Sequence, residues 1–162
     1  MDVSGVTIDG VAAKGFERKD GELRIALDRA RTKDETFTLA IDYGGKPQSG
    51  IWFYHPTPEH PEVPLQVWTQ GEGTENRHWI PIYDLPDDRL TSTLTITVPL
   101  DLETLSNGDV TSVPDPDDPS RRTDTWRLDR AHVPYLITLV VGDFETVERD
   151  AAGVRQFDLV PH

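Results

Sequence analysis

The sequence has no cysteine, and that absence excludes several classes of protein at once. Without thiols the chain cannot be a disulfide scaffold, use a cysteine nucleophile or hold a metal through thiolates. Positive charge is also scarce. The 162 residues include 16 Lys and Arg but 29 Asp and Glu, which gives a formal net charge of −13. A chain this acidic repels phosphate backbones, so nucleic acid is not expected as a partner.

Long apolar runs are missing as well. No stretch approaches the roughly 20 apolar residues that a membrane helix requires. The first ten residues, MDVSGVTIDG, have neither the basic region nor the apolar region of a signal peptide. We therefore expect a soluble chain without a membrane segment or a signal peptide, and the sequence indicates no compartment. A length of 162 residues predicts a single domain.

Apolar and polar residues alternate with a period of two through most of the chain, which predicts antiparallel strands. The clearest alternation lies at residues 22–27, 36–43 and 92–98, and the continuous apolar run 135–141 predicts a strand buried on both faces. Weaker strands are expected at 3–8, 50–54, 65–69, 123–128, 144–148 and 154–159. No segment has a persuasive helical period. The predicted fold class is an all-β, single-domain antiparallel β-sandwich.

Turn residues separate these predicted strands. Lys19-Asp20-Gly21 and residues 150–153 predict hairpin loops. Residues 55–64 contain four prolines and cannot form a central strand, and residues 113–120 are a second proline-rich loop, acidic and exposed. We expect the core to contain Trp68 and at least two of Leu94, Ile96 and Val98.

Motifs of catalysis are absent from the chain. The five histidines form no His-Glu-x-x-His, and neither Gly-x-Ser-x-Gly nor Gly-x-Gly-x-x-Gly occurs. His55, Glu59, His60 and Glu62 could supply nitrogen and oxygen ligands to a metal, but a solvated proline-rich loop is the favoured interpretation. We therefore expect no catalytic residue and no metal site in this chain.

One loop has the composition of a binding element. Glycines flank Glu72 in Gln70-Gly71-Glu72-Gly73, so the backbone can turn tightly and present the carboxylate. A carboxylate beside an amide can receive a ligand's ammonium group. The alternative is that Gln70 and Glu72 only hydrogen-bond the loop to itself.

An ordered set of short motifs resembles the N-terminal domain of the M1 family of zinc aminopeptidases, which includes leukotriene A4 hydrolase. The resemblance starts at Gly50-Ile51-Trp52-Phe53 and runs through Trp68-Thr69-Gln70-Gly71-Glu72, Asn76-Arg77-His78-Trp79-Ile80-Pro81 and Tyr83-Asp84-Leu85-Pro86 to Asp87-Asp88-Arg89. It continues with Leu105-Ser106-Asn107-Gly108, Thr125-Trp126, Tyr135-Leu136 and Val141-Gly142-Asp143-Phe144-Glu145. Each motif is short, but together they cover nearly the whole chain in order.

The resemblance implies a saddle-like β-sandwich over residues 1–162, in agreement with the strand pattern. It implies that Glu72 holds the free α-amino group of a peptide substrate and that Gln70 lines the pocket for the first side chain. Arg77, Asp84, Pro86 and Asp87 would be structural. The zinc would lie in a C-terminal catalytic domain, so this chain would be its partner and not catalytic by itself. The alternative is a freestanding β-sandwich module that binds or interacts without peptidase activity.

Overall fold

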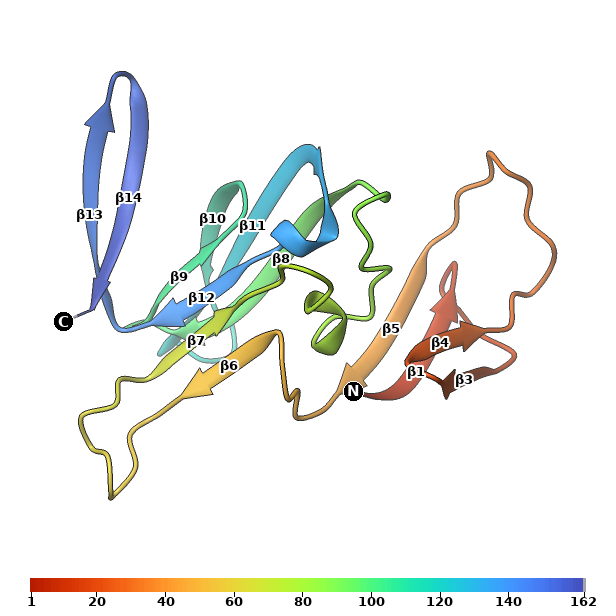
Figure 1. Ribbon diagram of the computed structural model, residues 1–162, viewed down its shortest axis with the longest axis horizontal. Coiled ribbons are helices and arrows are strands. Elements are labelled where there is room, and N and C mark those ends of the chain that lie inside the picture. Colours follow the sequence, from red (N-terminus) through yellow and green to blue (C-terminus); the bar gives the residue numbers. More distant parts are fainter. Residues whose placement is uncertain (162) are drawn as a thin grey trace.

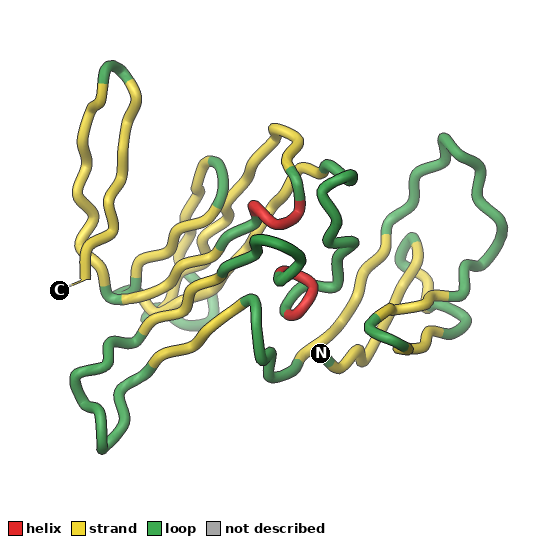
Figure 2. Tube along the Cα trace, in the orientation of Figure 1, coloured by secondary structure: helices red, strands yellow, loops and turns green. Residues whose placement is uncertain are grey.

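The structure is a computed structural model that describes residues 1–161. Strands make up 51% of the chain and helices 4%, so the predicted all-β class is confirmed (Figure 2). In chain order the strands are β1 (Asp2–Ile8), β2 (Val11–Ala12), β3 (Phe16–Lys19), β4 (Glu22–Ile25), β5 (Leu39–Gly44), β6 (Ile51–Tyr54), β7 (Gln66–Thr69), β8 (Leu90–Pro99), β9 (Glu103–Ser106), β10 (Asp109–Pro114), β11 (Arg121–His132), β12 (Leu139–Gly142), β13 (Phe144–Ala151) and β14 (Val154–Pro161). Two short 3-10 helices, η1 (Asn76–His78) and η2 (Pro134–Leu136), lie between strands.

Antiparallel pairing joins the strands into five sheets. A four-stranded sheet has the order β6-β7-β12-β9, and a three-stranded sheet has the order β10-β11-β8. The N-terminal part forms a second three-stranded sheet, β2-β1-β5, and the hairpin β3-β4. The hairpin β13-β14 ends the described chain and projects away from the other sheets (Figure 1).

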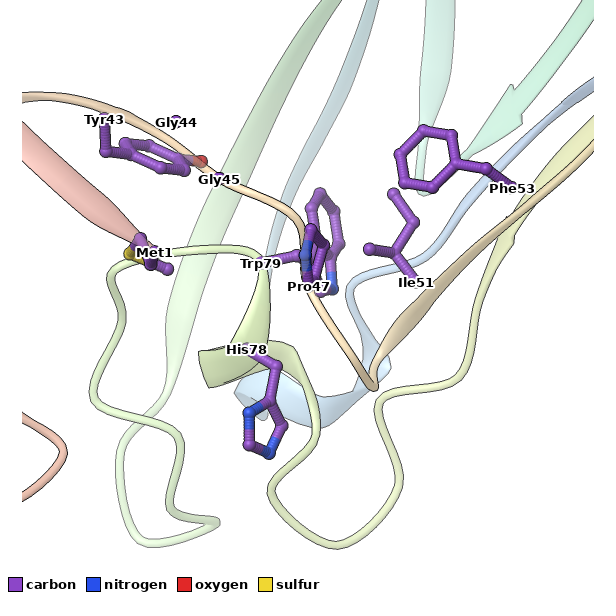
Figure 3. A pocket seen from close by; sticks show the side chains of 9 residues that line it. All are labelled: Met1, Tyr43, Gly44, Gly45, Pro47, Ile51, Phe53, His78 and Trp79. Carbon is purple, nitrogen blue, oxygen red and sulfur yellow. The ribbon is translucent and has the colours of Figure 1, made fainter.

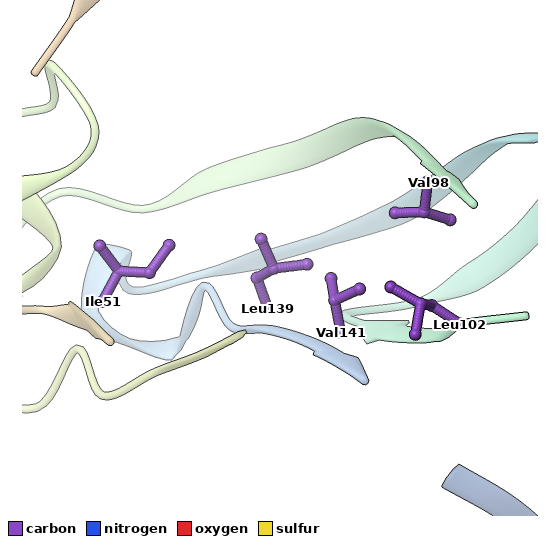
Figure 4. Close-up of a cluster of buried hydrophobic side chains, with 5 residues drawn as sticks. All are labelled: Ile51, Val98, Leu102, Leu139 and Val141. Carbon is purple, nitrogen blue, oxygen red and sulfur yellow. The ribbon is translucent and has the colours of Figure 1, made fainter. Parts of the chain in front are cut away.

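The two sheets in the middle of the chain share one hydrophobic core. Side chains from the four-stranded sheet meet side chains from β8 and from the turn that follows it (Figure 4). The buried members are Ile51, Val98, Leu102, Leu139 and Val141, and Val67, Trp79, Leu94 and Ile96 pack against them partly buried. Two sheets that bury facing side chains between them form a β-sandwich, as the alternation predicts.

Trp68 does not join this core, so the prediction of its burial is wrong. Val67, its neighbour on β7, packs against the core, and the pleat turns Trp68 to the opposite face. There its ring stacks on Trp52, with 4.7 Å between centroids, and on Tyr54, with 6.1 Å. Of the three apolar side chains predicted from β8, Val98 alone is buried. A period of two predicts that faces alternate, but it does not say which face another sheet covers.

The apolar run 135–141 is not a continuous strand either. Its first residues form η2, which Pro134 begins, and β12 starts only at Leu139. Asparagine side chains explain the difference, because Asn76 and Asn107 donate hydrogen bonds to carbonyl groups of the η2 turn, including that of Leu136. These carbonyls are satisfied without a strand partner. Leu136 is 51% exposed, so the prediction that this run is buried on both faces is wrong at Leu136.

Both predicted hairpin turns are confirmed. Asp20 and Gly21 have φ angles of 55° and 81° between β3 and β4, and Ala152 and Gly153 have 56° and 83° between β13 and β14. Two consecutive positive φ angles match the twist of antiparallel strands, and glycine accommodates them best. The proline-rich residues 55–64 lie between β6 and β7 without a strand, as expected. The second proline-rich loop is shorter than predicted, because β10 extends to Pro114.

A buried carboxylate ties the two sheets of the sandwich together. Asp124 on β11 is 1% exposed, and its Oδ2 accepts a hydrogen bond of 2.7 Å from the hydroxyl of Thr104 on β9. Arg122 donates from Nε to Oδ1 at 3.0 Å. Burial alone would raise the pKa of Asp124, but hydrogen bonds from Ser112, Thr104 and Arg122 outweigh it and lower the pKa. The group therefore stays ionised and bridges strands of both sheets.

Arginines close the N-terminal loop between β4 and β5. The guanidinium of Arg31 pairs with Asp28 at 2.8 Å, with Glu35 at 3.1 Å and with Asp9 at 3.2 Å. Arg29 also donates to Glu35 at 3.0 Å. The hydrogen bond from Arg29 lowers the pKa of Glu35 from 4.5 to about 2, against the opposing effect of burial. Glu35 is thus a charged anchor of this loop.

Replacement of Glu35 by glutamine is expected to lower the melting temperature at neutral pH but not near pH 2. The pKa of Glu35 is lower in the folded chain than in the unfolded chain, so the ionised form stabilises the fold above pH 4.5. That contribution disappears as the pH falls from 4.5 to about 2. Melting curves across this range check it, with Glu59→Gln in the exposed proline-rich loop as control. If Glu35→Gln lowered the melting temperature by the same amount at every pH, the stabilising role of the ionised Glu35 carboxylate would be contradicted.

Across residues 1–161 no helix is long and apolar enough to cross a lipid bilayer.

Candidate functional site

The loop after β7 carries both predicted site residues on the surface. Gln70, Glu72 and Gly73 are exposed, whereas Gly71 between them is buried. The backbone N–H of Gln70 donates to the carbonyl of Gly50 at 3.1 Å, which fixes the start of the loop against β6. The side-chain oxygen of Gln70 accepts a hydrogen bond of 2.9 Å from the backbone N–H of Glu72. The loop therefore bonds to itself through Gln70, but that bond uses the backbone of Glu72 and not its carboxylate.

Gly71 is needed because the loop packs directly on buried atoms. A Cβ at this position would lie 2.5 Å from the side-chain nitrogen of Asn76 and 2.5 Å from the carbonyl oxygen of Tyr135. Gly73 has a φ of 87°, a backbone conformation that residues with a Cβ rarely adopt. Both glycines thus shape the turn that presents Glu72.

Asn76 holds this loop to the rest of the domain. Its side chain is completely buried, and its Nδ2 donates to the carbonyls of Pro134 at 2.8 Å and Ile137 at 3.0 Å. Its Oδ1 accepts from the indole N–H of Trp79 at 2.9 Å. Sequence reasoning assigned Asn76 no role, because its partners at 134 and 137 lie far away in the chain. Asn76 thus fixes the surface against which Gly71 packs.

Arg77 and Asp84 have the structural contacts that the resemblance implies. The carboxylate of Asp84 is 1% exposed and accepts a hydrogen bond of 2.9 Å from the backbone N–H of Arg77. The guanidinium of Arg77 donates to the backbone carbonyl of Asp84 at 3.2 Å. The two residues close the segment that follows the candidate loop.

An apolar hollow of about 220 Å³ lies beside η1. Tyr43, Pro47, Phe53, His78 and Trp79 are among the residues that line it (Figure 3). Gln70 and Glu72 are not in its lining. The predicted binding residues therefore lie on an open surface of this chain and not in this hollow.

An open carboxylate has limited binding power by itself. Ion pairs between solvent-exposed groups contribute only about 0–1 kcal/mol, because water screens the charges. Glu72 can attract an ammonium group, but strong binding requires another surface that excludes water from the loop. On this open surface Glu72 alone can therefore supply only weak binding.

The described residues do not fit a zinc ion. Residues 1–161 contain no group of three or more His, Asp or Glu side chains placed to hold a metal. In the proline-rich loop, His60 pairs with Glu62 at 3.2 Å, and their side chains are 69% and 71% exposed. The fifth histidine, His162, lies outside the described residues. No step of metal chemistry is therefore assigned to this chain.

Known proteins resemble the chain over most of its length. It matches the Peptidase M1 N-terminal domain over residues 3–136. It is 27% identical to aminopeptidase N from Acetobacter pasteurianus over 157 residues, which cover 94% of this chain and 44% of that protein. It is 30% identical to human glutamyl aminopeptidase over 118 residues, 72% of this chain and 12% of that protein.

Solved structures confirm the fold. An M1 zinc metallopeptidase variant from Deinococcus radiodurans bound to a Tyr-Ser-Ala substrate has a TM-score of 0.75 and 21% identity, over 96% of this chain and 36% of that chain. The same enzyme in another crystal structure also gives a TM-score of 0.75, over 91% of this chain and 33% of that chain. The chain thus spans less than half the length of these relatives. Because the family match covers most of its residues, the chain belongs to the Peptidase M1 N-terminal domain family.

Proposed function

We propose that this chain is the substrate-recognition and scaffold domain of a zinc-dependent M1 aminopeptidase, which removes N-terminal residues from peptides. The observation that carries the proposal is the exposed loop Gln70-Gly71-Glu72, held on buried Asn76 in a member of this family. In this role Glu72 binds the α-ammonium group of the peptide. The chain is not catalytic by itself.

The chemistry of the loop supports this role. An aminopeptidase cleaves the peptide bond that follows the free α-amino group. It therefore needs an anion that holds this amine at a fixed distance from the attacked carbonyl. Glu72 has an exposed carboxylate on a backbone that the Gln70 hydrogen bond restrains. The Nε2 group of Gln70 takes no part in that bond and can face the first side chain of the peptide. The net charge of −13 also favours approach of a cationic amine.

The other half of the site would come from a C-terminal catalytic domain. One of the solved structures is described as a two-domain M1 zinc metallopeptidase, and this chain covers 36% of it. Zinc in that second domain would activate the attacking water. Docking of the two domains would exclude water from Glu72 and strengthen its contact with the ammonium group.

The natural gene provides the direct test. We expect the reading frame to continue beyond codon 162 into a domain with His-Glu-x-x-His, and the full protein to hydrolyse aminoacyl substrates in a chelator-sensitive way. The isolated chain should bind no stoichiometric zinc and hydrolyse none of these substrates. A full protein that lacks aminopeptidase activity with zinc supplied would contradict the proposal and favour a freestanding binding module.

A further inference from the structure

Strand β8 lies at one end of the three-stranded sheet and has an open edge. It pairs with β11 on one side, and no hydrogen bond between backbone groups of residues 1–161 reaches the other side of residues 91–97 (Figure 1). β8 has ten residues, whereas the other strands that end the three- and four-stranded sheets have two to six. The unpaired groups along such an edge form a template for another strand.

The hydrogen-bond pattern indicates which backbone groups face this edge. The N–H of Leu100 donates to the carbonyl of Ser120 at 3.0 Å, so this pair and every second pair before it bond β8 to β11. The residues between these pairs turn their N–H and C=O groups to the open side. They are Thr91, Thr93, Thr95 and Thr97, and all four are exposed. The guanidinium of Arg121 donates to the carbonyl of Thr97 at 2.9 Å, so one carbonyl near the end of the edge is already occupied.

β8 lacks the features with which edge strands usually avoid pairing. Charged side chains, proline within the strand and bulges are the common ones. The sequence LTSTLTITVP contains no charged residue, although 28% of the whole chain is charged, and its only proline is the last residue. Its register with β11 is regular from Ser92 to Pro99. The strand at the other end of this sheet, β10, is shorter and has Asp109 and Pro114 at its ends. β8 is therefore the edge of this sheet that is suited to pairing.

The inner face of β8 also lacks full cover. Val98 is buried in the core, but Leu94 and Ile96 are only partly buried. A strand added beside β8 would extend the inner face of the sheet and cover these two side chains further. Removal of this apolar surface from water would favour association.

The sequence of β8 matches itself when two copies run antiparallel. About a twofold axis at Thr95, Thr93 of one copy lies opposite Thr97 of the other. On the inner face Leu94 then lies opposite Ile96. Threonine thus faces threonine, and one aliphatic side chain faces another. We propose that two copies of this chain pair through β8 and join their three-stranded sheets into one continuous six-stranded sheet.

Charges just outside β8 fit this register. Arg89 precedes the strand and Asp101 follows it, and both are exposed without an ion partner among residues 1–161. In the register centred on Thr95, Arg89 of each copy lies opposite Asp101 of the other. A register centred on Leu94 would place Asp87 opposite Asp101, and like charges directly opposite each other are destabilising. Charge complementarity therefore favours the axis at Thr95.

Sedimentation equilibrium of the 162-residue chain is the first test. The buffer has about 0.15 M salt, which screens the repulsion between chains of net charge −13 beyond about 8 Å. We expect the mass to rise from 18.2 kDa toward twice that value as the concentration increases to about 1 mM.

Substitutions at the axis locate the interface. Thr95→Lys and Thr95→Glu place like charges opposite each other, so each variant alone should dimerise roughly fivefold more weakly or worse. An equimolar mixture of the two variants should recover the association. Thr111→Lys is the matched control, because it adds the same charge to an exposed threonine on β10 and should leave the association unchanged. Melting temperatures in dilute solution should stay within about 2 °C of the unmodified chain for all three variants.

Amide hydrogen exchange, measured residue by residue with NMR, gives a second readout. The amides of Ser92, Leu94 and Ile96 should be protected at every concentration, because they bond to β11. The amides of Thr93, Thr95 and Thr97 should exchange about tenfold more slowly or less at about 1 mM than in dilute solution. This alternation is specific to pairing at the open edge, since association through another surface would leave the threonine amides unchanged.

Four results would overturn the proposal. They are a mass of 18.2 kDa up to about 1 mM, a Thr111→Lys effect as large as that of Thr95→Lys, a mixture no heavier than either Thr95 variant alone, and threonine amides whose exchange does not depend on concentration. The loop Gln70-Gly71-Glu72 follows β7 in the other sheet of the sandwich. These results therefore bear on β8 alone, and measurements of peptidase activity bear on the proposed function.

Discussion

Replacement of Asn76 by alanine is expected to destabilise the domain by about 3–5 kcal/mol. The change removes a completely buried side chain with three hydrogen bonds, to the carbonyls of Pro134 and Ile137 and from the indole of Trp79. The carbonyl of Pro134 keeps its hydrogen bond of 3.0 Å from the backbone N–H of Ile137, whereas the carbonyl of Ile137 and the indole N–H of Trp79 lose theirs. Each buried group left without a hydrogen bond costs about 1–3 kcal/mol, because water cannot replace the amide there. This loss is a large share of the free energy of unfolding of a folded domain, which is typically about 5–15 kcal/mol.

Asn107 offers a matched control for this experiment. Its amide makes two comparable bonds to the same part of the chain, donating to Leu136 at 2.9 Å and accepting from the N–H of Thr138 at 2.9 Å. Asn107 is only partly buried, so water can replace its amide. Asn107→Ala should therefore cost about 1 kcal/mol. Urea unfolding of both variants is the measurement, and an Asn76→Ala loss no larger than that of Asn107→Ala would contradict the central role of Asn76.

Local sequence was sufficient to predict the candidate loop, because its signals lie within four residues. Gly71 and Gly73 on either side of Glu72 predict a tight turn with an outward carboxylate, and the structure has Glu72 exposed on such a turn. The same holds for the turn at Asp20-Gly21, where positive φ angles follow from the residue types. Such features need no information about the rest of the fold.

Features that depend on distant partners could not be predicted in this way. Asn76 has no local signal, since the carbonyls that it holds lie 58 and 61 residues away in the sequence. Trp68 lies in a strand with the predicted alternation, yet only the sheet opposite β7 decides which face is covered. The apolar run after Pro134 has the composition of a strand, but Asn76 and Asn107 from two other segments donate hydrogen bonds to its carbonyls at Ile137 and Leu136. Tertiary hydrogen bonds and sheet packing decided each of these three cases.

Replacement of Glu72 by alanine in the full parent enzyme is expected to lower kcat/KM by roughly 30-fold to several thousand-fold. This range corresponds to about 2–5 kcal/mol for loss of a charge-assisted contact in a desolvated site. If the ammonium contact also positions the scissile bond, kcat and KM should both change. Folding should change by less than about 0.5 kcal/mol, because the Glu72 side chain lies on an exposed loop.

Gln70→Ala separates recognition of the first side chain from recognition of the amine. The substitution removes the 2.9 Å bond to the backbone N–H of Glu72, but the exposed loop lets water take its place. We therefore expect a smaller loss of kcat/KM than for Glu72→Ala, together with an altered preference among aminoacyl substrates. The measurement is kcat/KM of both variants on a substrate panel, with melting temperatures alongside. Wild-type kinetics of Glu72→Ala on every substrate would show that Gln70-Gly71-Glu72 is only a structural turn, since an exposed carboxylate outside the substrate site has no other route to the reaction.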